Sequence, residues 1–239
     1  MMNLKGKVLL IPEKPDEDRD AVANAWLKSG GEVIRLARFW EPPALKSESV
    51  CVYGGSNFSL VVAQKLGLEL VSPADDWLLK LDSKWLKRKL FSRTLAEIES
   101  VSFPIFIKPI VPKIFSAGVF NSSQELAGKC KGLEMETKLL FAEVVRFESE
   151  ARAFVAEQQI LDCQIYEGRG EPHGAEDFIR SFLQTESVLP TCVIDVGFII
   201  DRGWAVVEVN ASWGAGLNGC AAHKILPAIA MATISKSFK

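Results

Sequence analysis

The residues best suited to chemistry lie in the segment Cys192–Gly216, which reads CVIDVGFIIDRGWAVVEVNASWGAG. This pattern is typical of two apolar strands joined by a turn and followed by a glycine-rich stretch. Three polar side chains interrupt the apolar strands: Asp195, Glu208 and Asn210. Because Glu208 and Asn210 are two residues apart, a strand places them on the same face.

A two-residue loop at Asp201 and Arg202 would place Asp195 directly opposite Glu208 in the hairpin. Directly opposed residues have Cβ atoms roughly 4.5–5.5 Å apart, and like charges at that separation destabilise a sheet. Two carboxylates and the amide oxygen of Asn210 on one face therefore favour a bound cation. All three are hard oxygen ligands, which suit Mg²⁺ held together with substrate phosphates. The alternative is a hairpin whose polar face is simply solvated.

The length and composition indicate a globular protein. The 239 residues allow one compact domain or two small ones, and 48% hydrophobic residues indicate a sizeable core. A net charge of −2 gives no support for a nucleic-acid partner. Five cysteines without a CxxC pair indicate neither a zinc site nor a disulfide framework. With no signal-like N-terminus and no apolar run of about 18 residues, we expect a cytoplasmic protein without a membrane partner.

The N-terminal part of the chain alternates between short apolar strands and helices. The pattern predicts strands over residues 7–11, 32–38 and 50–53, and helices over residues 16–29 and 56–66. Ser56 or Asn57 is the expected N-cap of the second helix. This order predicts a small α/β domain with a parallel sheet, and we place it at residues 1–80.

Residues 81–239 form the second predicted domain, in which strands, hairpins and helices alternate. Helical patterns cover residues 75–90, 122–131, 175–185 and 218–235, and extended patterns cover residues 103–110, 138–146 and 150–165. Hairpins late in the chain predict an α+β architecture with a mainly antiparallel sheet.

Lys108 lies inside the apolar strand Ile105–Pro109. A lysine there is costly unless its ammonium group is paired, although a lysine at a strand end can also extend its ammonium to solvent. The following loop, Lys113–Gly118, offers backbone N–H groups that could lie over phosphates.

Acidic and basic residues also follow the strand that ends near residue 146. Glu143 and Arg146 stand at that strand end, and Glu150 and Arg152 share one face of the next extended segment. A surface salt bridge explains such a pair equally well, and exposed pairs contribute little to stability.

Taken in this order, these residues resemble the ATP-grasp family over roughly residues 82–230. The motifs that carry the resemblance are Asp82-Ser-Lys84, Phe106-Ile-Lys108-Pro109, Glu143–Glu150 with Arg152, and Asp195…Glu208-Val-Asn210. The resemblance implies an ATP-grasp fold, in which two α+β subdomains clasp the nucleotide, preceded here by the small α/β domain.

The resemblance also implies a role for each matching residue. Lys84 and Lys108 would contact nucleotide phosphates, and Arg152 would face the phosphates, so that Lys108 and Arg152 are the expected catalytic residues. The remaining assignments are an adenine hinge at Glu143, Val144 and Arg146, a ribose contact at Glu150, and Mg²⁺ ligands Asp195, Glu208 and Asn210.

The implied activity is an ATP- and Mg²⁺-dependent carboxylate–amine ligase that forms an acylphosphate and then an amide bond, with small-molecule or peptide substrates. Two features depart from the family pattern. Val193 stands where many family ligases carry an arginine, for which Arg152, Arg180 or Arg202 could substitute, and Gly118 is the single glycine of its loop. The alternative is therefore a nucleotide-binding regulatory or partner-binding protein without ligase activity.

Overall fold

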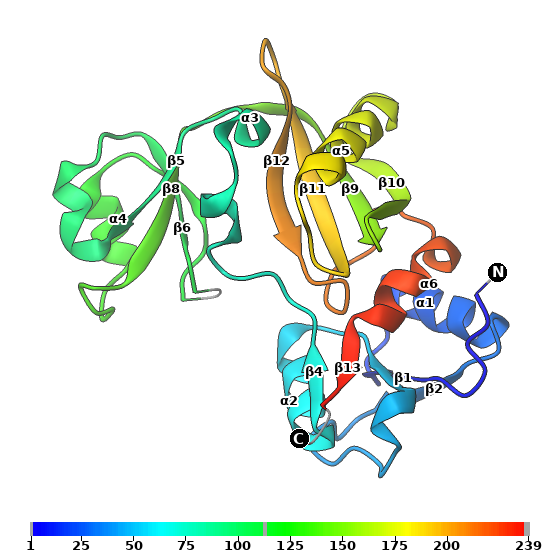
Figure 1. The fold of residues 1–239 in the computed structure, drawn as a ribbon. Helices are drawn as coiled ribbons and strands as arrows, with labels where there is room; N and C mark the ends of the chain where they lie inside the picture. Colours follow the sequence, from blue (N-terminus) through cyan, green and yellow to red (C-terminus); the bar gives the residue numbers. More distant parts are fainter. Residues whose placement is uncertain (1, 112–113, 237–239) are drawn as a thin grey trace. The chain divides into compact units, whose positions relative to one another are not determined.

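The computed structural model describes residues 2–111 and 114–236 (Figure 1). Its contacts divide the chain into two compact units. The first unit comprises Met1–Pro73, Ser149–Gly197 and Val207–Lys239, and the second comprises Ala74–Glu148 and Phe198–Val206. The division of the sequence into domains 1–80 and 81–239 stays a prediction.

The first unit begins with a parallel sheet of three strands in the order β2-β1-β3. The strands are β1 (Val8–Pro12), β2 (Glu32–Leu36) and β3 (Val50–Val52), and the helices are α1 (Glu17–Lys28) and α2 (Ser56–Leu66). A one-turn 3-10 helix, η1 (Ser47–Ser49), precedes β3. The predicted α/β arrangement of this region is therefore confirmed.

Local signals explain the ends of these two helices. The Asp16 side chain caps α1 by accepting a hydrogen bond from the backbone N–H of Arg19 at 3.0 Å. The N-cap of α2 is Gly55, so the prediction of Ser56 or Asn57 is wrong by one or two residues. The helix ends at Gly67, whose φ of +64° is a left-handed conformation that glycine adopts without a steric penalty.

A four-stranded sheet follows, in the order β10-β9-β11-β12. Its strands are β9 (Phe147–Ala156), β10 (Gln159–Gly168), β11 (Thr191–Ile199) and β12 (Gly203–Asn210), and α5 (His173–Thr185) packs against β10. The antiparallel pairing of β9 with β10 confirms the predicted hairpin.

The loop between β11 and β12 is longer than expected. The strands end at Ile199 and begin again at Gly203, which leaves three residues between them instead of the two on which the sequence argument was based. Asp201 and Gly203 adopt φ values of +64° and +81°, which allow this tight reversal.

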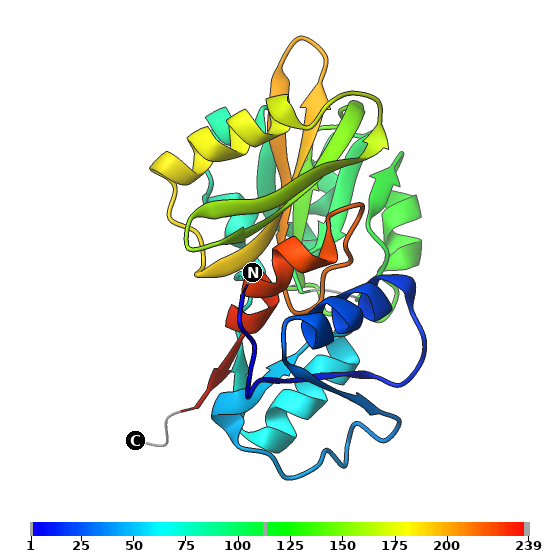
Figure 2. The same cartoon turned by 90° about the vertical axis from the view of Figure 1, so that its right-hand side faces the viewer.

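The C-terminal segment returns to the N-terminal part of the first unit. Helix α6 (Ala222–Met231) packs on α1, and β13 (Thr233–Ser235) pairs antiparallel with β4 (Leu68–Leu70), as Figures 1 and 2 show. The prediction of one helix over residues 218–235 is wrong at both ends. The shared core explains the docking, because Trp26 of α1, Phe154 of β9 and Ile225 of α6 are fully buried in one cluster.

The second unit is built on an antiparallel sheet in the order β5-β8-β6-β7. The strands are β5 (Leu90–Thr94), β6 (Ile105–Pro109), β7 (Gly118–Phe120) and β8 (Lys138–Ala142), joined by η3 (Leu95–Ser100) and α4 (Ser123–Lys129). Ile107 of β6, Leu126 of α4 and Phe141 of β8 are buried together. Lys113, at which the predicted phosphate loop begins, lies outside the described residues.

The predicted helix over residues 75–90 is wrong. The chain forms a 3-10 helix, η2 (Trp77–Lys80), and a single helical turn, α3 (Ser83–Leu86). Asp82 caps α3, and Lys87 ends it with a φ of +52°, after which the chain enters β5. None of the described helices is both long and apolar enough to cross a membrane.

Candidate functional site

The three predicted metal ligands lie together in the first unit. Asp195 comes from β11, and Glu208 and Asn210 come from the neighbouring strand β12. The Nδ2 group of Asn210 donates to Glu208 Oε1 at 2.8 Å and to Asp195 Oδ2 at 3.2 Å. The longer hairpin loop has therefore not separated these side chains.

Arg152 of β9 joins this cluster. Its Nε donates to Asp195 Oδ1 at 2.8 Å, and its Nη2 donates to Asp195 Oδ2 at 2.7 Å. The Asp195 side chain is only 2% exposed, and this burial raises the pKa of its carboxyl above the usual value although the bonds from Arg152 oppose the shift. For Arg152, burial lowers the pKa, but the bonds and charge of Asp195 prevail and the net shift is upward. The result is a buried, bidentate ion pair at the predicted metal site.

A second acid, Glu150, lies on the same strand as Arg152 and accepts a hydrogen bond from the hydroxyl of Tyr166 at 2.6 Å. Burial raises the pKa of Glu150, the Tyr166 bond opposes this, and the charges of neighbouring acids add to it. The Tyr166 ring also lies 5.8 Å from the guanidinium carbon of Arg152.

The sequence analysis did not find Tyr166. The residue lies at a register irregularity between Ile165 and Glu167, where β10 departs from regular pairing with β9. Strand alternation alone therefore could not show which residue of the hairpin lies beside Glu150.

The cluster fits the chemistry of Mg²⁺. Asp195 and Glu208 offer carboxylate oxygens, and Asn210 would add its amide oxygen after rotation of the amide. The structure contains no group of three or more His, Cys, Asp or Glu side chains suited to a metal within residues 2–111 and 114–236. Two carboxylates and one amide would therefore need further oxygens from phosphates or water.

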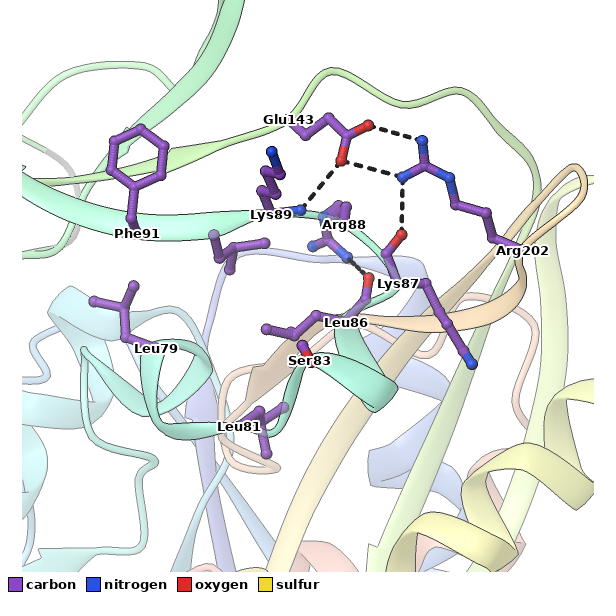
Figure 3. Close-up of a pocket in the computed structure, with 11 residues that line it drawn as sticks. Leu79, Leu81, Ser83, Leu86, Lys87, Arg88, Lys89, Phe91, Glu143 and Arg202 are labelled. Carbon is purple, nitrogen blue, oxygen red and sulfur yellow. Dashed lines mark hydrogen bonds and ion pairs between the residues drawn. The ribbon is translucent and has the colours of Figure 1, made fainter. Parts of the chain in front are cut away.

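The second unit contains a pocket of about 590 Å³ beside β5 (Figure 3). Its lining combines apolar side chains with four basic residues and one acid: Leu79, Leu81, Ser83, Leu86, Lys87, Arg88, Lys89, Leu90, Phe91, Glu143 and Arg202. This surplus of positive charge favours anionic ligands.

Glu143, expected at the adenine hinge, is held by Arg202 in this pocket (Figure 3). The two side chains form bonds of 2.7 and 3.1 Å, and the backbone N–H of Lys89 donates to Glu143 at 3.2 Å. The hydrogen bonds from Arg202 and then from Lys89 lower the pKa of Glu143 to about 2. Arg202 also donates to the carbonyl oxygen of Lys87 at 2.9 Å.

Arg88 is a half-buried residue of this pocket that the sequence analysis missed. Its Nη1 donates to the carbonyl oxygens of Leu86 at 3.0 Å and Val206 at 2.8 Å, and its guanidinium carbon lies 5.5 Å from the Phe147 ring. The available signal was the basic run at residues 87–89, directly after the motif that contains Lys84.

The structure places the other nucleotide candidates of the second unit as follows. Lys84 is exposed on α3, with Nζ 5.1 Å from the Trp85 ring. Lys108 is half-buried in β6, beside the fully buried Ile107. Val144 and Arg146 are exposed and belong to no strand, so their backbone groups are not committed to a regular sheet ladder. All of these assignments stay predictions.

The position of the missing family arginine is occupied by a core residue. Val193 is fully buried in the cluster that contains Trp26 and Phe154. Of the possible substitutes, Arg152 contacts Asp195, while Arg180 lies on α5 near Glu176. Arg152 is therefore the best-placed cation in the first unit.

A family model described as an ATP-grasp domain matches the chain over residues 85–228. The protein thus belongs to the ATP-grasp proteins. Within them, the matching model is that of the second family of one clade, which confirms the resemblance found in the sequence. No curated protein sequence matches the chain.

Solved structures show the same fold at low sequence identity. A RimK domain protein ATP-grasp from Sphaerobacter thermophilus DSM 20745 has a TM-score of 0.64 at 14% identity, covering 93% of this chain and 99% of its own. N5-carboxyaminoimidazole synthetase from Staphylococcus aureus has a TM-score of 0.60 at 12% identity, covering 98% of this chain and 80% of its own. The ATP-grasp ligase PsnB, complexed with minimal precursor, Mg and ADP, has a TM-score of 0.50 at 13% identity, covering 88% and 90%. These similarities confirm the ATP-grasp fold with its mixture of helices and strands.

Proposed function

We propose that this protein is an ATP- and Mg²⁺-dependent carboxylate–amine ligase that acts on small-molecule or peptide substrates. The observation that carries the proposal is the cluster of Asp195, Glu208 and Asn210 with Arg152, in a chain that belongs to the ATP-grasp family. The structural neighbours support it, because they include an ATP-grasp ligase complexed with Mg and ADP and a synthetase of a small molecule. A reaction that consumes ATP also suits the cytoplasm, where we propose that it takes place.

The nucleotide contacts follow residue by residue. We assign the phosphates to Lys84, Lys108 and Arg152, and the ribose hydroxyls to Glu150. The adenine contacts are assigned to the segment of Glu143, Val144 and Arg146, through backbone groups. Mg²⁺ would be held by Asp195, Glu208 and Asn210, and would neutralise phosphate charge during transfer.

The chemistry has two steps. An oxygen of the substrate carboxylate attacks the γ-phosphorus of ATP, the bond to the bridging oxygen breaks, and ADP leaves with the electron pair. The substrate amine then attacks the acyl carbon, inorganic phosphate leaves, and the nitrogen loses a proton to form the amide. Lysine and arginine side chains stabilise the charge that develops on the transferring phosphoryl group.

The test is release of phosphate and ADP from ATP in the presence of pooled carboxylic acids and amines. We expect Glu208→Gln to abolish release, because the substitution removes one ligand charge while keeping the shape of the side chain. Glu32→Gln, an exposed acid on β2, is the matched control and should behave as the unmodified protein does.

The same variant has a second readout. Mg-ATP should raise the melting temperature of the unmodified protein more than ATP with a chelator does, and Glu208→Gln should remove that difference. If Glu208→Gln retains the Mg²⁺-dependent shift, the assignment of Glu208 to the metal is wrong.

A nucleotide-binding protein without ligase activity is the second candidate. The buried Val193 favours it, because an apolar core side chain stands where family ligases carry an arginine. Mg²⁺-dependent binding of ATP without phosphate release for any pair of acid and amine would support this candidate over the ligase.

A further inference from the structure

The peptide bond between Gly216 and Leu217 is held from both sides within the first unit. The backbone N–H of Leu217 donates to Asp18 Oδ2 at 2.8 Å, and the carbonyl oxygen of Gly216 accepts from Arg152 Nη1 at 2.9 Å. Asp18 belongs to α1, near the N-terminus of the chain, and lies 199 residues away from Leu217 in sequence. A helix of the N-terminal sheet region is thus linked to the guanidinium that binds Asp195.

The two hydrogen bonds reinforce one another. A carboxylate that accepts from a peptide N–H polarises the peptide and makes its carbonyl oxygen a better acceptor for the arginine. The acceptor position of Asp18 is also sterically restricted, because a Cβ on Gly216 would lie 2.9 Å from Asp18 Oδ2. The glycine therefore allows the carboxylate to approach this peptide closely.

Arg152 is oriented by these contacts. Its Nε and Nη2 bind the two oxygens of Asp195, and its Nη1 binds Gly216. Rotation of the guanidinium out of this plane would break all three bonds. A second residue of the N-terminal region anchors the same loop, since the hydroxyl of Tyr53 donates to the carbonyl oxygen of Ala215 at 2.8 Å.

We propose that Asp18 is a positioning residue of the candidate active site. It acts through the Gly216–Leu217 peptide to orient Arg152, and through Arg152 it orients the carboxylate of Asp195. An acid in the first turn of a helix also stabilises the helix by itself, and the closely spaced Asp20 does so without contacting Leu217. Asp20 instead binds Arg35 at 2.6 Å, which makes it a suitable control.

The first test is the NMR signal of the Arg152 Nε–H group in the protein without nucleotide. We expect Asp18→Ala to shift this signal and to speed its exchange with solvent, while Asp18→Asn, which retains an acceptor oxygen, gives a smaller change. Asp20→Ala should leave the signal in place. A folded Asp18→Ala protein with an unchanged Arg152 signal would overturn the proposal. If Asp18→Ala does not fold, Asp18→Asn decides the question in the same way.

The second test measures the Mg²⁺ concentration that half-saturates nucleotide binding, and this part rests on the proposed function. Loss of a residue that orients a ligand carboxylate typically weakens metal affinity 10–100-fold, so we expect an increase of about 10-fold in Asp18→Ala. An unchanged Mg²⁺ requirement would contradict the proposed link to Asp195. If the unmodified protein binds no Mg-ATP, the proposed function fails, whereas the Arg152 signal still decides the role of Asp18.

Discussion

The guanidinium of Arg152 binds both carboxylate oxygens of Asp195, at 2.8 and 2.7 Å, although the two residues are 43 positions apart. Both side chains are largely buried, at 11% and 2% exposure. Removing one partner of such a pair leaves an uncompensated buried charge.

We therefore predict that Arg152→Ala lowers the free energy of unfolding by about 3–5 kcal/mol. Chemical denaturation followed by circular dichroism measures this loss. The double variant Arg152→Met with Asp195→Leu should recover much of it, because no unpaired charge then remains. Equal losses in the single and double variants would show that packing, not charge pairing, accounts for the stability.

The second prediction concerns the pH response of Glu143. Its pKa of about 2 is below the usual 4.5, so the stabilisation from its Arg202 pair is complete above the usual value and disappears as the pH falls from about 4.5 to 2. Arg202→Gln should raise the pKa of Glu143 toward 4.5, as measured by NMR titration of its carboxyl carbon. Arg93→Gln, a surface arginine 3.9 Å from Glu97, is the control and should leave Glu143 unchanged.

The third prediction concerns Lys108 in β6. Lys108→Ala should weaken ATP binding by about 1.5–3 kcal/mol, the usual cost of one charge-assisted hydrogen bond, while the fold is retained. Isothermal calorimetry gives the affinity. Lys129→Ala, at the end of α4, is a control that should leave the affinity unchanged. An unaltered affinity in Lys108→Ala would return this residue to the structural alternative of a lysine that only reaches solvent.

The fourth prediction ranks two residues of the nucleotide assignment. Val144→Ile should leave ATP affinity nearly unchanged, because a hinge that reads adenine through backbone groups does not use the side chain. Glu150→Gln should weaken binding through the ribose hydroxyls while retaining an acceptor for Tyr166. Tyr166→Phe separates the two effects, since it removes the tyrosine bond and keeps the acid. Calorimetry that finds the opposite ranking would show that the hinge is misplaced.

Local patterns in the sequence determined much of the fold. Alternating and apolar runs predicted β1, β9 with β10, and β11 with β12, and helical spacing predicted α1, α2 and α5. The ordered motifs around Lys108, Glu143, Asp195 and Glu208 pointed to the ATP-grasp family. These features could be predicted because strand and helix periods, caps and motif spacing are properties of neighbouring residues.

Tertiary structure decided the contacts between distant residues. The sequence could not show that Arg202 binds Glu143, that Tyr166 binds Glu150, or that β13 pairs with β4. Each depends on register, loop length or the docking of separate elements, and a change of one residue in register turns a side chain to the other face. The hydrogen bond from Leu217 to Asp18 is the clearest case, because only the packing of α6 and its preceding loop beside α1 brings these residues together.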